Sequence, residues 1–153
     1  MPLNIRDLAI RARDFGPGER IPDRCTAYHE NALPELEISG VPTGTVELAL
    51  VVHDPDAPLP YGFVHWAVYG IAPTTRTIGA PGERAAYRVG PNSTGERAYL
   101  GPRPPASHGV HHYYFWVYAL DTPVDGEPAR EEFLDRYGDH VIEQNRVVGT
   151  YSA

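Results

Sequence analysis

His111 and Tyr113 are the residues whose types and spacing most directly suggest chemistry. They lie two positions apart in an apolar, aromatic segment, and side chains two positions apart on a β-strand point to the same side of the sheet. An imidazole and a phenol on one face can bind a single ligand together, because each can donate a hydrogen bond. Spacing alone does not separate this interpretation from an aromatic face packed into the core.

Two aspartates flank a proline in Asp54-Pro55-Asp56, directly after an apolar run. The fixed φ of Pro55, with Pro58 close behind, is expected to hold both carboxylates near the end of the preceding strand. By itself this tripeptide predicts only a turn, because Asp and Pro are common in turns. His65 lies within another apolar run, where an unpaired buried polar group costs about 1–3 kcal/mol, so its imidazole needs a partner.

Three strands are predicted to position these residues. They run over Val46 to His53, Val64 to Ile71 and Val110 to Asp121. The first is a continuous apolar run, and the third carries large apolar or aromatic side chains on both of its faces. Both strands are therefore expected to be covered on both faces.

The C-terminal part of the chain predicts helices instead. Ala129 to Tyr137 has apolar residues at helical spacing, and Asp139 is expected to cap a second helix that extends through Asn145. Val147 to Tyr151 is expected to be a closing strand. The stretch from Glu83 to Gly109 is dense in Gly and Pro and predicts a long loop, which in a compact domain usually has a function.

Composition limits the classes of function. The 153 residues predict a single domain spanning 1–153, and 16 prolines and 15 glycines between short apolar runs are typical of a β-sandwich or barrel. A net charge of -7 argues against nucleic acid as a partner. The single cysteine, Cys25, excludes an intrachain disulfide and fits a cytoplasmic location. Residues 1–15 lack the apolar stretch of a signal peptide, and no apolar run is long enough for membrane insertion.

Several motifs occur in the order found in phosphatidylethanolamine-binding proteins, and the chain resembles this family over roughly residues 20–151. The motifs are His53-Asp54-Pro55-Asp56-Ala57-Pro58, Gly62-Phe63-Val64-His65-Trp66, Gly101-Pro102-Arg103-Pro104-Pro105 and His111-His112-Tyr113. Gly138-Asp139-His140-Val141-Ile142 and Val148-Gly149-Thr150-Tyr151 are similar to the C-terminus of the prokaryotic Raf-kinase-inhibitor-like branch.

The resemblance implies a mainly β fold, an antiparallel β-sandwich of Greek-key type with one or two peripheral C-terminal helices. It also implies a small pocket for phosphate, phosphorylethanolamine or a similar head group. The implied ligand-binding residues are Asp54, Asp56, His65, His111 and Tyr113. The implied rim residues are Pro58, Pro102, Pro104, Pro105 and His108.

Three positions depart from the pattern of the prokaryotic branch. Arg103 stands where a cysteine is common, Ser93 where an aspartate usually follows Asn92, and His112 where arginine is usual. These departures leave the implied pocket in place and affect its rim and its ligand preference.

The leading hypothesis is a binding protein for a small anion, without a cofactor or a bound metal. Asp54 or Asp56 would orient and charge His65 or His111, and the imidazolium and the Tyr113 hydroxyl would donate to ligand oxygens. The second carboxylate would meet a ligand proton or ammonium. Binding is therefore expected to weaken as pH rises.

Two alternatives from other classes remain open. The same histidines and carboxylates could catalyse acid-base or metal-assisted chemistry on a small anionic or carbonyl substrate, although the pattern favours binding over catalysis. The protein could also be an interaction module that inhibits a kinase or protease, with a target that the sequence does not name. Self-association into a homodimer is compatible with either role.

Overall fold

The computed structural model describes residues 4–83 and 86–153. Arg84 and Ala85, which belong to the predicted loop between Glu83 and Gly109, lie outside the described residues, as do the first three residues of the chain. The rest of that loop contains one short extended piece, the two-residue strand β6 (Arg88–Val89), as predicted, and a short 3-10 helix at Ala106–His108 that was not predicted.

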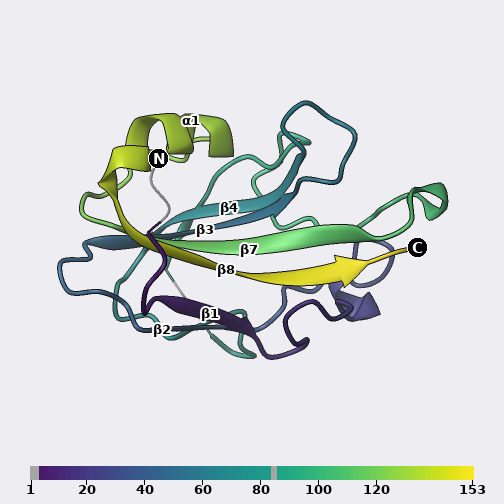
Figure 1. Cartoon of the computed structure of the whole chain (residues 1–153), viewed down its shortest axis with the longest axis horizontal. Helices are drawn as coiled ribbons and strands as arrows, with labels where there is room; N and C mark the ends of the chain where they lie inside the picture. Colours follow the sequence, from purple (N-terminus) through teal and green to yellow (C-terminus); the bar gives the residue numbers. More distant parts are fainter. Residues whose placement is uncertain (1–3, 84–85) are drawn as a thin grey trace.

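Two antiparallel sheets form the framework (Figure 1). The larger sheet has the order β6-β4-β3-β7-β8. Its strands are Arg88–Val89, Phe63–Ile71, Glu47–Asp54, His111–Leu120 and Val141–Tyr151. The smaller sheet has the order β1-β2-β5, with strands Ala9–Ala12, Leu36–Ser39 and Thr77–Ile78.

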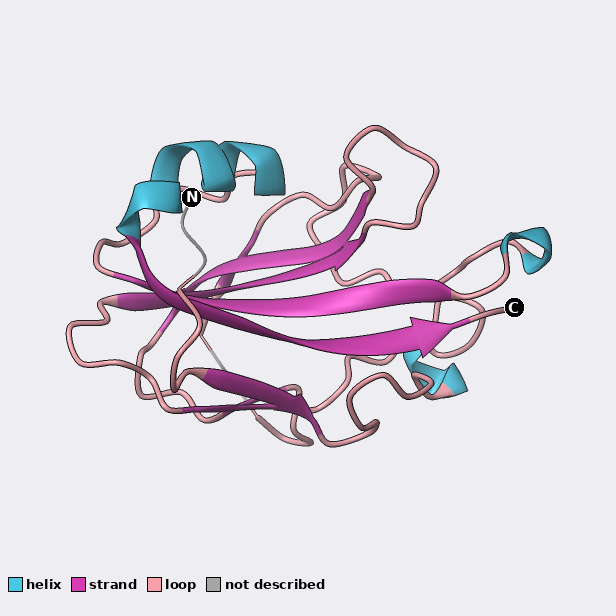
Figure 2. Cartoon of the chain, in the orientation of Figure 1, coloured by secondary structure: helices cyan, strands magenta, loops and turns pink. Residues whose placement is uncertain are grey.

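One helix, α1 (Arg130–Tyr137), covers the outer face of the larger sheet, and the smaller sheet covers the inner face (Figure 2). The main core lies between the sheets, where Leu36 and Ile38 of β2 pack with Leu50 and Phe115 of the larger sheet. A second apolar cluster places Phe133 of α1 in the layer on the opposite face. The predicted antiparallel sandwich with a peripheral C-terminal helix is confirmed.

The strands that carry the candidate site also match their predictions within one residue. All eight residues of β3 are buried, because β4 and β7 flank it in the sheet and apolar layers cover both of its faces. β7 pairs with β3 on one side and with β8 on the other, which fixes the register of His111 and Tyr113.

Two predictions about elements were wrong. The segment from Asp139 to Asn145 is a 3-10 turn followed by the start of β8, because the backbone from Val141 onward pairs with β7, beginning at Leu120. The outer face of β7 is also not covered throughout. His112 is exposed and Trp116 is only partly buried, since α1 packs over the other end of the strand.

Candidate functional site

The candidate site lies where β3 ends and where β4 and β7 begin. Because β3 is antiparallel to both neighbours, Asp54 at its last position comes beside Phe63 of β4, and His53 pairs with Tyr114 of β7. The loop from residue 55 to 62 and the loop from residue 100 to 109 close over this end of the sheet. Between them is a cavity of about 380 Å³.

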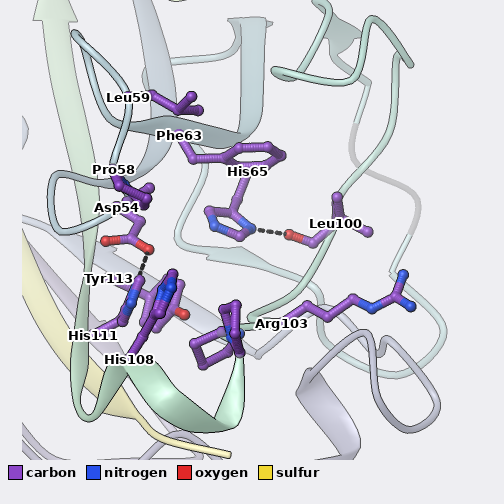
Figure 3. A pocket seen from close by; sticks show the side chains of 13 residues that line it. Asp54, Pro58, Leu59, Phe63, His65, Leu100, Arg103, His108, His111 and Tyr113 are labelled. Atoms are coloured by element: carbon purple, nitrogen blue, oxygen red, sulfur yellow. Dashed lines mark hydrogen bonds and ion pairs between the residues drawn. The ribbon is translucent and has the colours of Figure 1, made fainter.

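Four of the five predicted ligand-binding residues line this cavity. They are Asp54, His65, His111 and Tyr113 (Figure 3). The predicted rim residues Pro58, Pro104, Pro105 and His108 also line it. Further wall residues are Ala57, Leu59, Phe63, Leu100 and Arg103.

Asp54 is held by hydrogen bonds to both carboxylate oxygens. Oδ1 accepts the backbone N–H of Asp56 at 2.8 Å, which closes the turn around Pro55. Oδ2 lies 2.6 Å from Nδ1 of His111, and both side chains are about 95% buried. This contact places a proton on Nδ1 and fixes the orientation of the imidazole. The turn and the first residue of β7 are therefore one rigid unit.

Asp56 does not line the cavity. Its Oδ2 accepts hydrogen bonds from the backbone N–H of His112 at 2.7 Å and lies 2.8 Å from the His112 ring nitrogen Nδ1. Partial burial by itself raises the pKa of Asp56, but these hydrogen bonds outweigh it and lower the pKa below its usual value. Asp56 thus fastens the turn to β7 from the outside, which differs from its expected place beside the ligand.

His65 occupies the opposite wall as a neutral imidazole. Its Nδ1 lies 2.6 Å from the carbonyl oxygen of Leu100, so Nδ1 carries the proton and Nε2 keeps a free lone pair. Burial lowers the pKa of His65 to about 4, and the hydrogen bond to Leu100 offsets this only in part. His65 therefore accepts a hydrogen bond near neutral pH, and the expectation that it donates as an imidazolium is not supported.

Tyr113 contributes a hydroxyl that is free to bind. The residue is 1% exposed and lines the cavity, and none of the hydrogen bonds found within residues 4–83 and 86–153 involves its hydroxyl. Burial raises the pKa of Tyr113, so the hydroxyl stays protonated and can donate. Its ring packs edge-on against His65, with 5.2 Å between centroids, and this contact fixes its direction. A buried donor that faces a cavity without a partner suits a polar ligand.

The rim adds a histidine and an arginine. The ring of His108 stacks on that of His111, with centroids 5.6 Å apart and planes inclined by 6°. The guanidinium of Arg103 lies 5.9 Å from the ring centre of Tyr28, whose hydroxyl donates to the Pro104 carbonyl at 2.6 Å. No carboxylate of the described residues forms an ion pair with Arg103. The predicted rim residue Pro102 is buried outside the cavity wall.

Asn31 is a positioning residue that the sequence did not reveal. It adopts a positive φ of 54°, and its side chain bridges the loop by donating to the Tyr99 carbonyl at 3.0 Å and accepting the Gly101 N–H at 2.6 Å. These bonds hold the Leu100 carbonyl where it meets His65. Nothing in the sequence around Asn31 signals this role, because its partners are about 70 positions away.

The other two departures from the family pattern lie away from this cavity. Ser93 accepts the backbone N–H of Val64 through its hydroxyl oxygen at 2.7 Å, so it supports the start of β4. His112 is the exposed partner of Asp56. Of the three departures, only Arg103 therefore changes the cavity wall.

The comparisons with known proteins assign the chain to a family. The family model described as phosphatidylethanolamine-binding protein matches residues 11–152. The chain belongs to the phosphatidylethanolamine-binding protein family. A UPF0098 protein of Pyrococcus horikoshii is 38% identical over 145 residues, which cover 90% of this chain and 73% of that protein.

Two solved structures place the fold in the same family. A Chlamydia trachomatis protein described as a phosphatidylethanolamine-binding protein homologue superposes with a TM-score of 0.87 at 31% identity, covering 95% of this chain and 97% of that one. Escherichia coli YbcL, described as a member of the mammalian family, gives a TM-score of 0.85 at 27% identity, with 97% and 99% covered.

Potential metal ligands and membrane-spanning helices were sought in the described part of the chain. Within residues 4–83 and 86–153, no group of three or more His, Cys, Asp or Glu side chains is arranged to hold a metal ion. No helix in these ranges has the length and apolar character needed to cross a membrane.

Proposed function

We propose that this member of the phosphatidylethanolamine-binding protein family binds a small phosphate-type anion in the cavity between Asp54 and His65. The observation that carries the proposal is Tyr113, a buried residue that lines the cavity and whose hydroxyl forms no hydrogen bond within the described residues. A ligand oxygen would satisfy this donor, and Arg103 at the rim adds a positive charge.

The cavity also offers hydrogen-bond acceptors, which affects the form of the anion that it selects. Nε2 of neutral His65 accepts a hydrogen bond, and Asp54 carries a negative charge beside the His111 ring. A fully ionised anion would leave His65 without a donor. A phosphate group that keeps one proton can donate to His65 and accept from Tyr113 at the same time.

Isothermal titration calorimetry with inorganic phosphate and sulfate tests this function. Sulfate has the same shape but carries no proton near neutral pH, so we expect phosphate to bind about tenfold more tightly, a difference of about 1.4 kcal/mol. We also expect phosphate affinity to fall between about pH 5.5 and 8.5, because the phosphate itself loses a proton in this range and its added negative charge is unfavourable beside the Asp54 carboxylate. Absence of phosphate binding at about 10 mM would reject the proposal, since the binding free energy would then be smaller than about 3 kcal/mol.

A hydrolytic role is a second candidate, favoured by the 2.6 Å contact between Asp54 and His111. A carboxylate that orients an imidazole in this way allows its other nitrogen to act as a general base toward water. Hydrolysis of p-nitrophenyl acetate is a simple probe. The control is His140, an exposed histidine whose ring nitrogen lies 2.8 Å from Asp121. Catalysis at the site would be favoured if the activity disappears in His111→Gln and persists in His140→Gln.

The remaining roles from the sequence stay predictions. A cytoplasmic location, a homodimer and an inhibitory protein partner are compatible with the proposed function. Size-exclusion chromatography with light scattering measures the oligomeric state directly. Affinity capture with and without phosphate would show whether the filled cavity changes a protein contact.

A further inference from the structure

We infer that the ligand of this cavity is a phosphate monoester with a compact apolar substituent, an inference that rests on the proposed function. The first argument is volume. The cavity holds about 380 Å³. A water molecule occupies about 30 Å³ of liquid, so an inorganic phosphate, with five heavy atoms, would leave most of this space empty.

The second argument is the distribution of polar and apolar groups on the wall. Figure 3 shows Asp54, His111 and Tyr113 together in one part of the cavity, while Leu59 and Phe63 lie in another. Pro104, Pro105 and Leu100 add further apolar wall. Outside the groups already assigned to the phosphate, the wall provides few partners for a polar substituent. An apolar group would therefore fill the remaining space better than a hydroxyl or an ammonium group.

The third argument is the exposure of the apolar wall. Leu59 is 53% exposed although it lines the cavity, and it follows Pro58 in a short loop whose turn is fixed by Asp54. Phe63 packs against His65, with 4.7 Å between ring centroids, so its ring is held in place beside the polar groups. A substituent on the phosphate would contact Phe63 first and Leu59 toward the opening, and would remove both from water.

Calorimetric titration at about pH 5.5, where phosphate monoesters keep one proton and His65 is still neutral, tests the inference with inorganic phosphate, phosphorylethanolamine, phenyl phosphate and butyl phosphate. We expect at least one apolar ester to bind about tenfold more tightly than inorganic phosphate and more tightly than phosphorylethanolamine. Preference for the phenyl ester would indicate a flat aromatic substituent, and preference for the butyl ester a short acyl or alkyl chain; either result supports the inference.

Leu59→Ser provides the matching variant, because a half-exposed loop residue can change without disrupting the core. It should weaken binding of the preferred ester about fivefold and leave inorganic phosphate unchanged. Val46→Ser, at a residue that is 50% exposed and does not line the cavity, should change neither affinity.

The outcomes separate this inference from the function on which it rests. If phosphate binds and Tyr113→Phe weakens it, but the apolar esters bind no better than inorganic phosphate, the inference is overturned and the proposed function stands. If neither phosphate nor any ester binds, both are overturned. An ester that binds equally well to wild type and Leu59→Ser would also contradict the assigned apolar wall.

Discussion

Asp54 and His111 form a buried contact of 2.6 Å between Oδ2 and Nδ1, and a similar contact on the outside joins Asp56 to His112 at 2.8 Å. Two carboxylates of one short turn thus hold two successive residues of β7. The inner pair is about 95% buried, whereas the side chains of the outer pair are about half exposed. The two pairs have the same chemistry and differ in burial, so each is a natural control for the other.

Asp54→Asn should reduce both stability and phosphate affinity. The amide keeps the shape of the carboxylate but cannot accept from both the Asp56 N–H and the His111 ring, so we expect a loss of about 1–3 kcal/mol in the free energy of unfolding. The His111 ring would lose its fixed orientation, and phosphate affinity should fall about tenfold. Urea denaturation and calorimetry measure the two effects.

Asp56→Asn is the matched control for this prediction. Exposed ion pairs contribute about 0–1 kcal/mol, so this variant should remain stable and bind phosphate within about threefold of wild type. An equal loss of phosphate affinity in both variants would contradict the separate roles of the two aspartates.

Tyr113→Phe should weaken phosphate binding about tenfold with little change in stability, because the lost hydroxyl lines the cavity and forms no hydrogen bond within the described residues. Tyr69→Phe is the opposite case. The Tyr69 hydroxyl is fully buried and donates to the Pro128 carbonyl at 2.8 Å, so its removal should cost about 1–3 kcal/mol of stability and leave phosphate affinity unchanged. A destabilised Tyr113→Phe with normal affinity would remove the main support for the proposed site.

The sequence was sufficient where the information was local or periodic. The apolar runs predicted β3, β4 and β7, and alternation along β7 correctly placed His111 and Tyr113 on one side. It failed for residues 139–145, where helix-capping signals competed with a strand that forms only because β7 provides ten pairing partners. The smaller sheet was also missed, since its strands are only two to four residues long.

In the candidate site too, local motifs were predictable and contacts with distant residues were not. The ordered motifs indicated its residues, but they could not distinguish Asp54 from Asp56, because the two differ only in which side of β7 they reach. The state of His65 depends on burial and on the carbonyl of Leu100, which is 35 positions away. The positioning role of Asn31 likewise depends on distant partners. These features require the folded chain.

Gly62→Ala should be strongly destabilising. Gly62 has a φ of +68°, and an added Cβ would lie 2.4 Å from the Asp54 carbonyl oxygen and 2.8 Å from Nε2 of His53. We expect a loss of more than about 2 kcal/mol, because positive φ and a backbone clash both oppose the side chain. Gly95 has a φ of +88°, and an added Cβ would have no atom within 4 Å. Gly95→Ala should therefore lower the free energy of unfolding by only about 1 kcal/mol. Thermal unfolding of both variants separates the clash from the dihedral effect.

The last prediction concerns the pH dependence of stability that His65 causes. Burial lowers its pKa to about 4 in the folded protein, whereas a histidine in the unfolded chain titrates near 6.5. Below pH 6.5 the unfolded state binds more protons, so stability falls as pH falls. The contribution is fully present above about pH 6.5 and is lost by about pH 4, with a total size on the order of 3 kcal/mol.

The comparison of wild type with His65→Gln isolates this contribution from that of the carboxylates. Between about pH 7 and pH 5, wild type should lose about 2 kcal/mol more stability than the variant, because glutamine does not titrate. His29→Gln, at a half-exposed histidine 4.0 Å from Asp23, should keep the wild-type dependence. If wild type and His65→Gln lose stability in parallel in urea titrations, His65 is not buried as a neutral acceptor, and the selection of a protonated phosphate would lose its basis.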